Sequence, residues 1–292
     1  MRPAKVTETF MPTEPTFDID RYRSALVTSS LLADHPSIRV GITGRIPERE
    51  PAEGNAGYGS PRDPEAAWIE RQRWATAAGI DPRALTSAYQ VHGNSVVNVN
   101  VDSRGIGGAP GSGSIGKADG LITASPGVAV MTLHADCMPI ILVDPEVPAV
   151  GVIHAGWRGT VADVAGETVR AMASAYGSRP ERLIALLGPG IRACCYEVGD
   201  EVVDAWRAFG ADVADQALEM GARKWHFDIA RANSLLLERA GVLPSHIEDQ
   251  AFCTQCNGDR WFSHRGQGPA TGRFAAIAAI APDDRKDSTT WF

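Results

Sequence analysis

The sequence lacks any long apolar run, since no segment approaches the roughly 18 consecutive apolar residues of a membrane-spanning helix. Its N-terminal residues also lack the apolar stretch, between a basic start and a small-residue cleavage site, that marks a secretion signal. No internal repeat and no linker between two apolar cores is visible along the 292 residues. We therefore expect one soluble, cytoplasmic domain that does not associate with a membrane.

Positive charge is also scarce. The chain has 28 Lys and Arg residues against 35 Asp and Glu residues, and no basic run offsets the net charge of −7. This balance argues against broad nucleic-acid binding. An anionic substrate would need a local cluster of arginines. Arg45, Arg158 and Arg265 lie in glycine-rich turns and are the candidates, although surface arginines are usually only solvated.

The cysteines are few and odd in number. Five cysteines do not suggest a disulfide framework, and their spacing suits reduced thiols or metal ligands better. The adjacent Cys194 and Cys195 are expected to be buried, as free cysteine usually is. One Cys-x-x-Cys pair cannot fill a tetrahedral zinc site without a second pair, so we expect Cys253 and Cys256 to have a packing role.

The apolar pattern predicts a mixed α/β fold. Short β-branched runs bounded by Pro, Asp and Gly indicate strands, and apolar residues at helical spacing indicate helices. Asp63 and Pro64 are suited to begin a helix over 64–78, as N-cap and first helical residue. We expect a loose arm over 1–18, one α/β domain over 19–282 and a frayed tail over 283–292. The other expected elements are a hairpin formed by 25–32 and 38–42, strands at 84–90, 128–133, 139–143, 149–153, 182–187 and 272–280, and helices at 160–176, 201–209 and 229–240.

The residues that can carry chemistry concentrate between 128 and 160. His134, Asp136 and Cys137 lie between two apolar runs, and His154 ends a third. His92 also follows an expected strand. Side chains at strand ends can point into a cleft, and two imidazoles with one thiol are ligands for a borderline-soft metal. The pattern does not choose between His92 and His134, and Asp136 suits a ligand-orienting, proton-transferring or turn-capping role.

Several motifs occurring in order resemble the laccase-domain family, also called multicopper polyphenol oxidases, laccase-domain purine nucleoside phosphorylases or bacterial peptidoglycan editing factors. The resemblance covers about 38–280 and implies a single domain with a four-layer α/β/β/α sandwich. It implies His92, Cys137 and His154 as metal ligands. The motifs are Gln90-Val91-His92-Gly93, Ala118-Asp119-Gly120, Ala135-Asp136-Cys137-Met138-Pro139, His154-Ala155-Gly156-Trp157-Arg158-Gly159-Thr160, Leu187-Gly188-Pro189-Gly190-Ile191, Cys195-Tyr196-Glu197-Val198-Gly199 and Cys253-Thr254-Gln255-Cys256.

The resemblance also implies a reaction. Two histidines and a thiolate leave one position of zinc open, and zinc lowers the pKa of bound water to about 7. Such a site suits adenosine deamination, and the family implies phosphorolysis of adenosine, inosine, guanosine and methylthioadenosine. Nucleoside and phosphate would then be the partners of a monomer or weak homo-oligomer. We expect Arg45, Arg158 or the helix start at Thr160 to hold phosphate.

Two further residues have expected parts in this scheme. Many relatives have Thr where this chain has His134. We therefore expect His134 to lie beside the metal ligands and to contribute to substrate binding. Asp136 is the expected acid/base residue, next to Cys137 and His154 in the catalytic set.

Three alternatives stay open. Copper-dependent phenol oxidation needs many histidines, yet only seven are present and none is two residues from another, although Cu²⁺ could occupy the His/His/Cys site. A hydrolase that edits peptidoglycan precursors would use Cys137 as nucleophile, free of metal and open to alkylation. In the third alternative the metal is structural and the protein is a non-catalytic scaffold.

Overall fold

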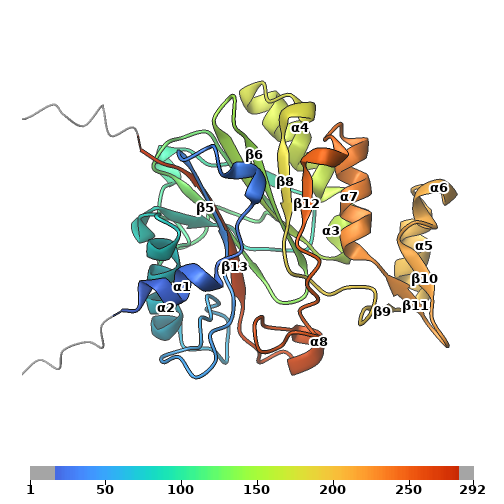
Figure 1. Ribbon diagram of the computed structural model, residues 1–292, viewed down its shortest axis with the longest axis horizontal. Coiled ribbons are helices and arrows are strands. Elements are labelled where there is room, and N and C mark those ends of the chain that lie inside the picture. The colour runs from blue at the N-terminus through green and yellow to red at the C-terminus, as the bar shows by residue number, and fades with distance from the viewer. Residues whose placement is uncertain (1–16, 283–292) are drawn as a thin grey trace, which may run out of the picture.

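The computed structural model describes residues 17–282. The expected tail over 283–292, and the expected arm over 1–18 except for its last two residues, lie outside this range. Two sheets lie face to face, with helices on their outer sides (Figure 1). The four-stranded sheet has the order β1 (Ile38–Ile42), β13 (Phe274–Ile280), β5 (Ala129–His134), β2 (Leu85–Ser87). The six-stranded sheet has the order β12 (Ile247–Asp249), β8 (Ile184–Leu187), β6 (Met138–Asp144), β7 (Ala149–Ala155), β4 (Gly120–Thr123), β3 (Val96–Asn98).

Helices cover both outer faces. α2 (Pro64–Ala77) packs on the four-stranded sheet, and α1 (Ile19–Ala25) packs on α2. α4 (Val164–Tyr176) and α7 (Ile229–Arg239) pack on the six-stranded sheet. The layer order is therefore α/β/β/α, which confirms the single mixed α/β domain expected from the sequence. Within residues 17–282, no helix is long and apolar enough to cross a membrane.

Strand β6 shows why the two sheets form a sandwich. Successive side chains of a strand point to opposite faces. Met138, Ile140 and Leu142 pack in the core beneath the helices, and Ile141 and Val143 pack against the opposite sheet. Every residue of β6 is buried, so the strand appears as a continuous apolar run rather than an alternating one.

Some expected elements were correct. β1 has the predicted bounds, and α2 begins at Pro64, where the Asp63 carboxylate accepts hydrogen bonds from the backbone N–H groups of Glu65 and Ala66. The glycine-rich segment over 105–116 contains no helix and no strand beyond one isolated bridge.

Other expectations were wrong. The segment 25–32 is not a strand, because α1 runs to Ala25 and only one bridge, from Val27 to Ile42, joins β1. The helix expected over 160–176 starts earlier, and Asp163, in the left-handed region at φ 61°, divides it into α3 (Trp157–Val161) and α4. Periodicity cannot reveal a single non-helical residue of this kind.

A third, small sheet lies to one side of the sandwich and was not predicted. Its strands have two or three residues, which is too few for an alternating pattern to be recognised. They are β10 (Leu218–Met220), β11 (Trp225–Phe227) and β9 (Glu197–Val198), beside α5 (Asp200–Arg207) and α6 (Ala211–Ala214). The remaining short helices are α8 (His264–Gln267) and the 3₁₀ turns Ser30–Leu32, Pro82–Ala84, Val101–Ser103, Pro180–Arg182 and Pro244–His246.

Candidate functional site

His92, Cys137 and His154 meet at one end of the sandwich. Cys137 lies in the turn between β5 and β6, His154 is near the end of β7, and His92 follows β2. Ligand atoms of the three side chains all lie within 4.8 Å of one another. The antiparallel pairing of β6 with β7 places Pro139 opposite His154, so the sheet register itself brings the histidine to the cysteine turn.

Asp119, the residue before β4, organises this group, although the sequence analysis assigned it no role beyond its place in a motif. Its buried carboxylate accepts backbone N–H groups of Val91, His92 and Gly93 at 3.1, 3.0 and 2.7 Å. It also accepts the Nδ1–H of His154 at 2.8 Å. Asp119 therefore holds the backbone at His92 and the imidazole of His154, and it leaves Nε2 of His154 available to a metal.

The three side chains fit a metal centre of the open type. A carboxylate behind an imidazole fixes its tautomer, a common arrangement in zinc sites. Two histidines and one cysteine give zinc three ligands, and all three line the same cavity of about 730 Å³. A fourth position facing that cavity would be accessible to substrate.

His134 lies behind this group and does not line the cavity. Its side chain is buried and stacks on Phe274, with ring centroids 5.6 Å apart. Its Nε2 is 2.9 Å from the Thr132 hydroxyl and its Nδ1 is 3.2 Å from the Cys137 carbonyl oxygen. Burial, with His154 nearby, holds the pKa of His134 well below its usual value. His134 is therefore not placed to contact a substrate in the cavity, as the sequence led us to expect. It instead supports the turn that carries Cys137.

Arg45 also lies outside the cavity. Its guanidinium pairs with Glu53 at 2.6 Å and donates to the Gly258 carbonyl at 2.9 Å, in a separate hollow. Arg158 and Arg265 do line the cavity. Three further arginines that the sequence did not single out, Arg62, Arg71 and Arg273, line it as well. Arg45 is therefore not placed to bind a phosphate in this cavity.

Asp136 adjoins Cys137 and lines the cavity. Its two carboxylate oxygens accept the Thr254 hydroxyl and the Arg265 backbone N–H, both at 2.6 Å. The residue is buried and has a left-handed backbone with φ 83°. Asp136 thus connects the cysteine turn to the loop before α8 and to the start of that helix.

Cys137 and His154 form a strongly coupled pair when no metal is present. Burial raises the pKa of Cys137, but contact with His154 and His92 outweighs burial and lowers it to about 6. Burial lowers the pKa of His154, but Cys137 and Asp119 together raise it to about 9. At neutral pH the metal-free pair is therefore a thiolate beside an imidazolium.

Alkylation of Cys137 is expected to follow this ionisation. In chelator-treated protein the thiolate persists at pH 7, and the iodoacetamide rate should fall by about tenfold from pH 7 to pH 5 as the pH passes through the lowered pKa. Bound zinc should protect the thiol across this range. Peptide mass spectrometry can separate Cys137 from the other four cysteines. A rate that still rises steeply above pH 8 would contradict the lowered pKa.

Gly156 leaves room for the ligands. A Cβ at this position would lie 3.0 Å from both the Cys137 sulfur and Cδ2 of His92. We expect Gly156→Ala to displace two of the three ligands and to weaken zinc affinity by about 10- to 100-fold, with the fold intact. Competition with a chromogenic chelator measures this, and Gly177→Ala, strained by its backbone φ of 72° but with nothing within 4 Å of the added carbon, controls for a general loss of stability. Unchanged affinity in Gly156→Ala would show that the ligands sit elsewhere.

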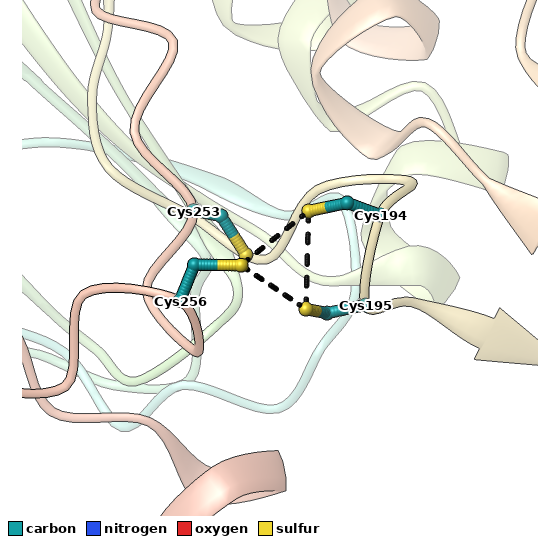
Figure 2. Close-up of side chains that lie close together, drawn as sticks. All are labelled: Cys194, Cys195, Cys253 and Cys256. Carbon is teal, nitrogen blue, oxygen red and sulfur yellow. Dashed lines mark hydrogen bonds between the residues drawn. The ribbon is translucent and has the colours of Figure 1, made fainter.

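A second cluster corrects an expectation about the remaining cysteines. Cys194, Cys195, Cys253 and Cys256 come together, with their sulfur atoms within 4.8 Å of one another (Figure 2). Cys194 is exposed and Cys195 is half-buried, so neither is buried as expected, and the Cys-x-x-Cys pair does have a second pair as partner. The sequence interpretation was wrong because it treated each pair alone.

Comparison with known proteins gives consistent matches. Residues 42–281 match the family model described as multi-copper polyphenol oxidoreductase laccase. A purine nucleoside phosphorylase of Deinococcus radiodurans is 37% identical over 219 residues, which are 75% of this chain and 79% of that protein. The adenosine deaminase RL5, from an unknown prokaryotic organism, is 34% identical over 200 residues, 68% of this chain and 76% of that protein.

A solved structure shares the fold. The crystal structure of YlmD from Geobacillus stearothermophilus superposes with a TM-score of 0.80 at 31% identity, and the match covers 86% of this chain and 94% of that one. The family match spans both sheets and all three residues of the His/Cys/His group. The chain therefore belongs to the multi-copper polyphenol oxidoreductase laccase family.

Proposed function

We propose that this protein is a zinc-dependent purine nucleoside phosphorylase with adenosine deaminase activity. Its substrates would be adenosine, inosine, guanosine and methylthioadenosine, converted to the free base and ribose 1-phosphate. One observation supports this most strongly: a single cavity holds the His92, Cys137 and His154 group together with the arginines Arg62 and Arg273. Relatives named for both activities support the same proposal.

The arginines would provide the phosphate site. Arg62 donates to the Thr271 carbonyl oxygen at 2.6 Å, while its buried Nε has no hydrogen-bond partner. Arg273 donates to the carbonyl oxygens of Thr271 and Gly272, both at 2.8 Å. Burial lowers the pKa of both groups, and the charge of Arg62 lowers that of Arg273 further. Two neighbouring guanidinium groups that form no ion pair with a carboxylate among residues 17–282 favour an anion.

Other residues would position the nucleoside. Aromatic side chains of Tyr58, Trp157 and Tyr196 line the cavity and offer flat apolar faces to a purine. Arg158 lies over the Trp157 ring, 4.3 Å from its centroid, which keeps its charge at the cavity wall. Zinc held by His92, Cys137 and His154 would supply Lewis acidity.

We propose Asp136 as the acid/base residue, because it lines the cavity beside Cys137. Asp136→Asn retains the shape and one acceptor oxygen, which can still accept the Arg265 N–H while the amide group donates to the Thr254 hydroxyl, but it cannot exchange a proton at this position. The variant is expected to lose one limb of the pH–rate profile of kcat/KM. If both limbs remain, Asp136 has only the connecting role that its hydrogen bonds describe.

Chromatography of adenosine after incubation with zinc-loaded protein tests the proposed function. Adenine that forms only with phosphate indicates phosphorolysis, and inosine without phosphate indicates deamination. Adenosine that stays unchanged under both conditions would contradict the proposal.

The phosphate site makes its own prediction. We expect Arg62→Ala and Arg273→Ala each to raise the KM for phosphate by about 10- to 100-fold, because each loses charge-assisted hydrogen bonds of about 1.5–3 kcal/mol. The KM for nucleoside should change much less. Arg45→Ala is the matched control, since it removes an arginine that lies outside the cavity. Equal effects in all three variants would contradict the assignment.

A cysteine hydrolase acting on peptidoglycan precursors is the second candidate, favoured by the low pKa of Cys137 in the metal-free pair. Such a hydrolase would stay active after a chelator removes zinc, whereas the phosphorylase would lose its activity. Copper-dependent phenol oxidation is less well supported, because among residues 17–282 the two clusters of potential ligands contain only two histidines. Occupation of the site by Cu²⁺ in vitro is still compatible with the ligand set.

A further inference from the structure

Two loops that are far apart in the sequence bring four cysteines together beside the cavity. Cys194 and Cys195 lie between β8 and β9, and Cys253 and Cys256 lie between β12 and α8. Cys194 and Cys256 are 62 residues apart in the chain. Figure 2 shows the side chains of the two loops turned toward a common centre. We call these four residues the cysteine tetrad.

The spacing of the sulfur atoms fits one metal ion. A tetrahedral zinc–thiolate centre with Zn–S bonds of about 2.3 Å has neighbouring sulfurs about 3.8 Å apart. In the tetrad, the Cys194 sulfur is 3.8 Å from that of Cys195 and 3.7 Å from that of Cys256. The sulfurs of Cys195 and Cys256 are 3.4 Å apart. These distances are close to the edges of the expected tetrahedron.

Two other uses of the thiols fit less well. A disulfide would bring two sulfurs to about 2.05 Å and leave the other two without a shared partner. An iron–sulfur cluster distributes its thiolates over several iron atoms and so spreads the cysteines farther apart. Four sulfurs around one point, with none bonded to another, match a single tetrahedral ion.

We propose that the cysteine tetrad binds a second zinc ion, separate from the His92, Cys137 and His154 group. Four thiolates leave no open position, so the site would be structural and not catalytic. Binding would release the protons still held by the thiols.

The position of the tetrad indicates what the ion would stabilise. The two loops already touch, since the Gly190 N–H donates to Phe252 and the Thr254 N–H donates to Gly190, at 3.2 and 3.0 Å. The first loop contributes Ile191 and Tyr196 to the cavity wall. The second does not line the cavity, but its Thr254 hydroxyl donates to Asp136, which does. A zinc ion would therefore fix one wall of the cavity and the loop that supports Asp136 in the Cys137 turn.

Metal counting on the full chain tests this proposal separately from catalysis. We expect protein purified under reducing conditions to contain about two zinc ions per chain, by inductively coupled plasma mass spectrometry. Cys256→Ser and Cys137→Ala should each contain about one, and the double variant about none. A Cys256→Ser variant with the wild-type zinc content would overturn the proposal. So would peptide mapping without reductant that finds a disulfide between the two loops.

Cobalt substitution provides a readout that does not depend on a folded Cys256→Ser variant. In the Cys137→Ala background only the tetrad is complete, so Co²⁺ should produce the intense visible and thiolate charge-transfer bands of tetrahedral sulfur coordination. Absence of these bands in folded Cys137→Ala protein would overturn the proposal. Neither result depends on whether the protein cleaves nucleosides, so failure here leaves the proposed function standing.

Discussion

Cys137→Ala is expected to reduce nucleoside phosphorolysis by at least about a thousandfold, the largest effect we predict. The substitution removes the only sulfur ligand of the His/Cys/His group and the negative charge that His154 faces. Two neutral imidazoles bind zinc far more weakly than two imidazoles with a thiolate. Activity should be measured at saturating substrate with zinc in the buffer, to separate weak metal binding from loss of chemistry.

The matched control is Cys256→Ser, which changes one cysteine of the tetrad and leaves the His/Cys/His group intact. It should retain far more activity than Cys137→Ala. Wild-type activity in Cys137→Ala would contradict the assignment of Cys137 as a ligand. Retained zinc with lost activity would instead favour a nucleophilic role for the thiol.

Arg71→Met is expected to lower the free energy of unfolding by about 3 kcal/mol, the largest effect on stability we predict. Arg71 lies in α2 with a buried side chain. Its guanidinium donates to the carbonyl oxygens of Ala56, Gly107 and Gly108 at 2.7, 3.0 and 2.7 Å, and lies 3.6 Å from the centre of the Tyr58 ring. Methionine fills a similar volume but donates nothing, so the three carbonyl groups lose the guanidinium as donor, although Gly107 keeps the Ser87 hydroxyl and Gly108 keeps the Tyr58 hydroxyl.

Chemical denaturation followed by circular dichroism measures the change. Arg83→Met is the control, because Arg83 is 83% exposed and its pair with Asp81 is screened by solvent. That variant should leave the free energy of unfolding unchanged within experimental error. If Arg71→Met changes the free energy of unfolding equally little, water replaces the guanidinium. The segments that carry Ala56 and Gly107–Gly108 are then not held by Arg71.

The sequence alone predicts the secondary structure of the sandwich better than its layers. Continuous apolar runs in β6 and β7 indicate buried strands, but both outer faces of the sandwich carry helices, so the pattern does not specify which sheet a strand joins. The four-layer arrangement came from the family resemblance. The smallest sheet, with strands of two or three residues, has no period to detect.

The candidate site was predictable only in part. His154 and Cys137 are close in the sequence and flank paired strands, so their proximity follows from local pattern. His92 reaches them through Asp119, a contact between residues far apart in the chain that no spacing rule reveals. Arg62 and Arg273 come from opposite ends of the sequence for the same reason. Long-range packing, and not local propensity, determines these neighbours.

Phosphorus NMR of a reaction with inosine and inorganic phosphate tests the central claim most directly. With zinc-loaded wild-type protein, we predict that the phosphate signal is replaced by ribose 1-phosphate in equal amount to the hypoxanthine released, and that Cys137→Ala gives no new signal. Base release with an unchanged phosphate signal would mean hydrolysis, and no base release would mean that the cavity does not cleave purine nucleosides. Either result would contradict a zinc-dependent phosphorylase.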